Sequence, residues 1–152
     1  MGKNKFAKYF SPIWILLWAF LILAAISPIF WDSGFLLDYL QIFFSKICHQ
    51  MHGRCFIIDG FTTLVCSRCL GIYTGFLLGW IFLVVFRPIA LYLSKRSFGF
   101  AFFFVPAILD WLLRILGIIQ ANNYIGMITG FLLAFGIDIL IFDLIYNDNK
   151  KL

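Results

Sequence analysis

Residues 69–86 read CLGIYTGFLLGWIFLVVF, an apolar run without a single charged side chain. Because about 20 predominantly apolar residues cross the ~30 Å of bilayer hydrocarbon, this stretch predicts a membrane-spanning helix. Glycines recur at every fourth position, at Gly71, Gly75 and Gly79. On a helix that spacing aligns them along one face, where a second helix can approach closely. The stretch therefore predicts a membrane helix packed tightly against a neighbour.

The rest of the chain has the same apolar character. Of its 152 residues, 63% are hydrophobic and only 12% are charged. A water-soluble domain cannot bury that much apolar surface, so the composition indicates an integral protein of the lipid bilayer. Membrane-length stretches occupy residues 12–31, 69–86, 97–119 and 125–146. We therefore expect an all-α fold with a single domain over residues 1–152, in which four transmembrane helices form a bundle.

The last two predicted spans should lie side by side. Only residues 120–124 connect them, which favours an antiparallel pair of helices. The fourth span carries Gly126 and Gly130 at the same spacing as the glycines of the second. This repeated small-residue pattern predicts a second face for close helix packing.

The net charge of +5 reflects membrane topology and not nucleic-acid binding, because most basic residues lie in the two terminal tails and in the loop between the second and third spans. Under the positive-inside rule, both termini are expected in the cytoplasm of a multi-pass cell-membrane protein, with residues 48–69 facing outward. We expect the first span to be retained as an anchor, since its apolar run exceeds the 7–15 residues of a signal peptide. The basic residues assigned to the cytoplasmic side are Lys3, Lys5, Lys8, Arg87, Lys95, Arg96, Lys150 and Lys151.

The segment between the first two spans predicts two short elements. Residues 35–47 are apolar but too few to cross the bilayer, with Asp38, Gln41 and Ser45 along one side, which is typical of a helix lying in the interface. Residues 56–65 are rich in β-branched side chains around an Asp-Gly turn, which predicts a small hairpin. Such a hairpin would bring the cysteines on its two sides together.

All four cysteines and both histidines of the chain fall within residues 48–69. Thiolates and neutral imidazoles are the usual protein ligands of zinc, and a Cys-x2-Cys pair presents two thiolates to one ion. The candidate zinc site is therefore an outward-facing Cys/His loop at the membrane surface. Its predicted ligands are Cys48, His49, Cys66 and Cys69, with His52 and Cys55 as possible additional ligands.

Two other interpretations of the same thiols remain open. Cys66 and Cys69 precede a predicted helix whose N-terminus would stabilise a thiolate, as in a membrane thiol-disulfide oxidoreductase. An outward-facing compartment also permits plain structural disulfides. The histidines favour the metal site, because a disulfide needs no imidazole.

Ionisable residues inside the predicted spans are functional candidates, because charge in hydrocarbon is costly. Asp110 and Arg114 lie at i and i+4, within pairing reach, and Asp138 lies deeper in the fourth span. They indicate either a structural ion pair or a site for a lipid-linked or small anionic substrate, and a small transporter or accessory subunit is a further alternative. The predicted outer polar pocket comprises Arg54, Arg68, Asp110, Arg114, Asn123 and Thr129.

Two motifs resemble those of an uncharacterised prokaryotic membrane family, domain of unknown function 2085. They are Ile47-Cys48-His49-Gln50 and Val65-Cys66-Ser67-Arg68-Cys69-Leu70-Gly71-Ile72-Tyr73-Thr74-Gly75, which match the signature CHQ…CxRCxGIYxG. The resemblance extends to Asp110, Asn123 and Thr129, over roughly residues 45–135. The resemblance implies that the residues important in the family include Cys48, His49, Gln50, Arg54, Cys66, Arg68, Cys69, Gly71, Tyr73 and Gly75. Serine is frequent in the family where this chain has Cys55. The family brings no known activity, so the resemblance leaves open whether the protein is an enzyme.

Overall fold

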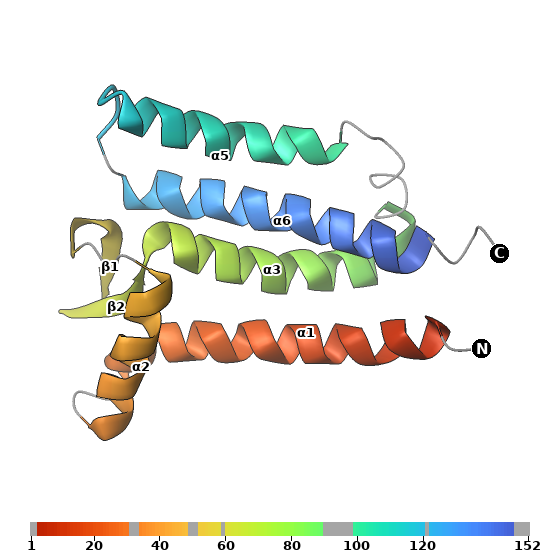
Figure 1. Cartoon of the computed structure of the whole chain (residues 1–152), viewed down its shortest axis with the longest axis horizontal. Coiled ribbons are helices and arrows are strands. Elements are labelled where there is room, and N and C mark those ends of the chain that lie inside the picture. The colour runs from red at the N-terminus through yellow and green to blue at the C-terminus, as the bar shows by residue number, and fades with distance from the viewer. Residues whose placement is uncertain are drawn as a thin grey trace.

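The computed structural model describes residues 3–30, 34–48, 52–58, 60–89, 99–120 and 122–147. Four long helices run side by side, and the start of the first and the end of the last lie at the same end of the molecule (Figure 1). The smaller elements gather at the opposite end. The long helices are α1 (Lys3–Ala25), α3 (Ser67–Val85), α5 (Gly99–Ile115) and α6 (Asn123–Asn147); the smaller elements are η1 (Ser27–Ile29), α2 (Phe35–Ile47), η2 (His52–Arg54), β1 (Cys55–Ile58) and β2 (Phe61–Cys66).

Two of the helices meet the requirements of a membrane span by length and composition. Within the described residues these are α3 and the Asn123–Ile145 part of α6. In α1 the apolar part, Phe10–Ala25, is shorter. The predicted first span ends later than α1 does, because the chain leaves the helix after Ala25 and forms η1, with Pro28 in its first turn.

The glycine faces are where α3 and α6 meet. A side-chain carbon added at Gly71 would collide with the backbone carbonyl of Met127. At Gly75 it would lie 2.7 Å from the carbonyl oxygen of Phe131, and at Gly130 it would collide with the carbonyl of Arg68. These contacts confirm the close packing predicted from the glycine spacing. The absent side chains bring the two backbones together along the halves of α3 and α6 that lie nearer the hairpin.

The other half of the helix layer is filled by aromatic side chains. Trp80 of α3 and Phe142 of α6 are buried and meet edge to face. Phe10 of α1 packs on Trp80, whose indole N–H donates to the hydroxyl of Ser11 at 3.1 Å. These contacts join α1 to α3, while α5 packs on α6 through contacts such as Phe103 with Phe135.

Both short elements predicted between the first two spans are confirmed. The helix α2 has the predicted bounds and lies across the direction of α1 (Figure 1). The strands β1 and β2 form an antiparallel hairpin in which Ile58 pairs with Phe61, and the turn residue Gly60 has a φ of +85°, a conformation that favours glycine. At the other end of the hairpin, Cys55 lies opposite Cys66.

Candidate metal centre

Three cysteines from three different elements meet at the start of α3. Cys48 ends α2, Cys66 ends β2 and caps α3, and Cys69 lies in the first turn of α3. The hairpin makes this arrangement possible, because it turns the chain back so that Cys66, at the end of β2, lies beside Cys48 at the end of α2. The arrangement therefore depends on the turn at Gly60 as much as on the cysteines themselves.

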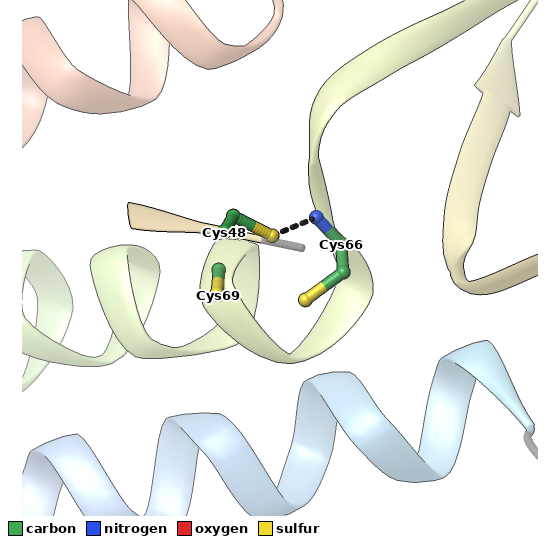
Figure 2. A group of neighbouring side chains, drawn as sticks. All are labelled: Cys48, Cys66 and Cys69. Atoms are coloured by element: carbon green, nitrogen blue, oxygen red, sulfur yellow. Dashed lines mark hydrogen bonds between the residues drawn. The ribbon is translucent and has the colours of Figure 1, made fainter. Parts of the chain in front are cut away.

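The three sulfur atoms lie within 4.8 Å of one another. Figure 2 shows their side chains gathered at the N-terminal end of α3, where the backbone N–H of Cys66 donates to Cys48 Sγ at 3.2 Å. Cys48 is 4% exposed, whereas Cys66 and Cys69 are partly accessible. The structure describes all four cysteines of the chain, and it has each as a free thiol.

An apolar shell borders the cysteine cluster. Cys48 belongs to a core that contains Phe44 of α2, Val65 of β2 and Tyr73 of α3. Ala24 and Ala25, from the end of α1, complete it. Since such a shell limits the access of water, the sulfur atoms lie against a dry interior.

The electrostatic environment shifts the pKa values of Cys66 and Cys55 in opposite directions. A hydrogen bond from the Cys69 thiol is the main reason that the pKa of Cys66 is lowered to about 5. The N-terminus of α3 favours negative charge at the same place. Burial, followed by the nearby charges of Cys48 and Cys66, raises the pKa of Cys55 to about 11. Cys66 is therefore poised to ligate as a thiolate, while Cys55 stays protonated.

The remaining predicted ligands have different standings. His49 lies outside the described residues, and of His52 the structure describes only the backbone, in η2. Gln50, which belongs to the family signature and is not a predicted ligand, also lies outside the described residues. Cys55 is buried opposite Cys66 in the hairpin, but it is not part of the cluster of three sulfur atoms. The structure thus brings together three of the four predicted ligands and leaves one competing ligand out.

A group of three charged side chains lies on the other side of α3. Asp110 of α5 is 6% exposed and accepts hydrogen bonds from two arginines. Arg114 donates to it from Nε at 2.9 Å, as the i, i+4 spacing predicted, and Arg68 donates from Nη2. The ion pair with Arg68 joins α3 to α5 near the start of α3. We refer to Arg68, Asp110 and Arg114 as the arginine–aspartate group.

The other members of the predicted polar pocket are spread around this group. Arg114 also donates to the backbone carbonyl of Asn122 at 3.2 Å, and the Asn122 side chain caps the start of α6. Asn123 donates to the carbonyl of Cys55 at 3.1 Å, which ties α6 to the hairpin. Thr129 is buried and bonds to carbonyls of its own helix, and Arg54 is exposed on η2. Several local links therefore join these polar residues to neighbouring elements.

Two features of the site have no clear local signal in the sequence. Arg68 and Asp110 are 42 positions apart, so only the packing of α3 beside α5 and α6 pairs them. Asp138, predicted as a deep intramembrane acid, is fully buried beside Gly79. A side-chain carbon added at Gly79 would lie 2.8 Å from the Asp138 carboxylate. Neither of its carboxylate oxygens has a hydrogen-bond partner among the described residues. The position of Tyr73 beside the cysteines, by contrast, has a local signal, because its i+4 spacing from Cys69 places both residues on the same helix face.

Asp110→Asn should destabilise the protein much more than Arg68→Gln. Removing the carboxylate leaves two arginines without their anion in a largely buried position, a loss of about 3 kcal/mol. Removing Arg68 leaves Asp110 paired with Arg114, and the Arg68 side chain is 35% exposed, so the expected loss is about 1 kcal/mol or less. Unfolding by denaturant in a fixed detergent measures both. Equal losses for the two variants would show that Asp110 does not unite the group.

Comparison with known proteins agrees with this architecture. Residues 48–140, more than half of the chain, match the family described as predicted membrane protein (DUF2085). An uncharacterized protein of Methanocaldococcus jannaschii is 29% identical over 154 residues, which cover 94% of this chain and 99% of the relative. Another, of Methanothermobacter thermautotrophicus, is 30% identical over 97 residues, 64% of this chain and 86% of the relative. No solved structure matches. The chain therefore belongs to the DUF2085 family of predicted membrane proteins, as its motifs indicated.

Proposed function

We propose that this membrane protein carries a structural zinc site at its outer surface, with Cys48, His49, Cys66 and Cys69 as the ligands. The observation that carries the proposal is the meeting of three sulfur atoms from α2, β2 and α3 within 4.8 Å. Zinc–sulfur bonds of about 2.3 Å at tetrahedral angles hold sulfur atoms about 3.8 Å apart. The cluster therefore needs only a small contraction to surround an ion.

His49 is the proposed fourth ligand because it follows Cys48 directly in the chain. Three thiolates and one imidazole form one of the closed ligand sets of structural zinc sites. The ion would fasten the end of α2 and the hairpin to the first turn of α3. The lowered pKa of Cys66 supports this role, since zinc binds the thiolate and not the thiol.

The proposed topology has four spans with both termini in the cytoplasm. Large apolar side chains remain exposed on α1 and α5, including Leu16, Phe20, Phe102 and Leu109, and such surfaces fit contact with lipid better than contact with water. The distribution of basic residues supports the orientation. Beyond the labelling of the unmodified chain, whose native thiols set the background, an impermeant maleimide should label Arg54→Cys in intact cells, and Lys150→Cys only after permeabilisation. The reverse pattern would overturn the orientation.

Metal analysis of the purified full-length chain, with the thiols counted in the same sample, tests the zinc site. About one zinc per chain is expected, as for a single four-coordinate site. Cys48, Cys66 and Cys69 should resist alkylation until a chelator is added. A metal-free protein with a reducible bond between Cys66 and Cys69 would overturn the proposal.

That last outcome would favour a second function, thiol–disulfide exchange. The specific observation behind it is the Cys-x2-Cys pair at a helix N-terminus, where a hydrogen bond from the Cys69 thiol lowers the pKa of Cys66 to about 5. In this reaction the Cys66 thiolate attacks a substrate disulfide, forms a mixed disulfide with one substrate sulfur and releases the other as a thiolate. That thiolate takes the proton of Cys69, and the Cys69 thiolate then attacks Cys66 Sγ and displaces the second substrate sulfur as a thiolate, which takes a proton from water. The substrate is reduced to two thiols while the Cys66–Cys69 disulfide forms.

The pH dependence of alkylation checks the thiolate at Cys66. In chelator-treated protein, the rate at Cys66 should be nearly constant between about pH 6 and pH 8, because its pKa of about 5 leaves it ionised throughout. An ordinary thiol, with a pKa of 9.0, would gain about a hundredfold in rate over that interval. Cys69→Ala removes the hydrogen bond and should restore the steep dependence. Peptide-resolved mass spectrometry measures each site, and a steep profile in the unmodified chain would contradict the expectation.

A further inference from the structure

We propose that a cavity between α3, α5 and α6 holds an acyl chain of an anionic membrane lipid, whose headgroup is bound by Arg68. This site is separate from the proposed zinc site and lies on another face of α3. The cavity has a volume of about 220 Å³. Its lining residues are Arg68, Ile72, Ala107, Ile108, Trp111, Thr129, Gly130 and Leu133.

The arginine–aspartate group supplies the charge that selects an anion. It contains two arginines and one carboxylate, so it has an excess of one positive charge. Within the described parts of the chain, Asp110 is the only carboxylate recorded as paired with either arginine. An excess cation at the edge of a membrane is costly unless water or an anion compensates it. A lipid phosphate at this position would neutralise the group.

Arg68 retains the donors that such an anion needs. A guanidinium has five N–H groups, and only Nη2 of Arg68 has a partner among the residues that the structure describes. The side chain is 35% exposed, and it lines the cavity while it bonds Asp110. Asp110 therefore holds the guanidinium at the mouth of the cavity, where its other N–H groups can donate to phosphate oxygens.

The rest of the cavity suits an acyl chain. Beyond Arg68 its one polar lining residue is Thr129, whose hydroxyl is already bonded to carbonyls of its own helix. Ile72 lies one turn further into α3, and Leu133 lies a turn beyond Thr129 in α6. The cavity thus has a charged outer end and an apolar inner end, the same polarity as a lipid standing in a bilayer.

The size and the opening of the cavity fit part of a lipid. Its volume is below the about 300–1,000 Å³ of pockets that enclose a drug-sized molecule. Ile108 and Trp111 of its lining are each 56% exposed, so the cavity reaches the surface of α5. A segment of one chain can enter there while the remainder of the lipid stays in the bilayer. Basic pockets between membrane helices on the cytoplasmic side bind anionic lipid headgroups by the same charge pairing.

Tryptophan quenching in nanodiscs tests the proposal, because Trp111 lines the cavity. The full-length protein is placed in phosphatidylcholine discs that contain an equal small fraction of either brominated phosphatidylglycerol or brominated phosphatidylcholine. We expect an about fivefold preference for the anionic lipid at the Trp111 site, the selectivity of one basic residue near a membrane. Trp111→Phe identifies the part of the signal that belongs to this site.

Two variants and one control separate the contribution of the Arg68 charge from that of the cavity. Arg68→Gln should remove the preference, and Ala107→Phe should fill the cavity and reduce quenching by both lipids without touching the charges. Arg54→Gln, which removes an exposed positive charge from the same end, should leave the preference unchanged. Equal quenching by both lipids in the unmodified chain would overturn the proposal. So would a preference that survives both Arg68→Gln and Ala107→Phe. Zinc content in the same samples reports independently on the metal site.

Discussion

Cys66→Ser should lower the zinc content of the purified protein from about one ion per chain to background. A serine hydroxyl does not ionise at neutral pH, so the variant offers three ligands where four are needed. The protein should also unfold at a lower temperature, because a structural ion contributes its binding free energy to folding. Atomic absorption and thermal unfolding in detergent measure the two effects. A chelator should lower the unfolding temperature of the unmodified chain and leave that of the variant unchanged.

Cys55→Ser is the matched control within the same hairpin. Cys55 is buried and lies directly opposite Cys66, but it stands outside the cluster of three sulfur atoms. Its link to Asn123 uses the backbone carbonyl, so the substitution preserves that link. We expect the zinc content of this variant to equal that of the unmodified protein. Equal losses at Cys55 and Cys66 would contradict the assigned ligand set.

Gly71→Ala should cost more stability than any other single methyl group added to the glycine faces. The new carbon would collide with the backbone of Met127, which cannot rotate away as a side chain can, so α3 and α6 must separate. Overpacking of this kind costs about 1–3 kcal/mol or more. The effect opposes intrinsic propensity, since alanine is favoured over glycine within a helix by about 1 kcal/mol. Denaturant unfolding in detergent measures the net loss.

The comparison with Gly79→Ala tests the cause. There the added carbon faces the carboxylate of Asp138 at 2.8 Å and the ring of Phe135, and both are side-chain atoms that can shift. A smaller loss is therefore expected at Gly79 than at Gly71. Gly53→Ala serves as a control, because nothing lies within 4 Å of an added carbon there. Similar losses at Gly71 and Gly79 would show that backbone contact is not the main constraint.

The sequence predicted the short elements better than the ends of the long ones. The helix over residues 35–47 and the hairpin around Gly60 are confirmed because local signals define them, namely an apolar run of limited length and a turn that requires glycine. The first helix extends from Lys3 to Ala25 and not over residues 12–31. Hydropathy alone could not place these ends, because a helix continues into polar residues and stops where Pro28 and local packing redirect the chain.

The choice among the thiols could not be predicted from spacing. Cys55 and Cys48 are both candidates by sequence, and both are buried. The hairpin register puts Cys55 opposite Cys66, but the end of α2 brings Cys48 closer to the first turn of α3, where Cys66 and Cys69 lie. The spacing therefore identified the loop, and the path of α2 decided which sulfur atoms can share an ion.

The amino-acid sequence by itself determined the apolar character of the chain, the kinds of elements and the face by which α3 meets α6. These properties follow from hydrophobicity, turn chemistry and residue size, which act over a few neighbouring positions. Only the tertiary structure decided that Cys48 joins Cys66 from 18 positions away and that Asp110 binds Arg68 as well as Arg114. The physical reason is that contacts between distant segments depend on how whole helices pack. That packing is set by all the glycine and aromatic contacts of α3 and α6 together, and no short motif encodes it.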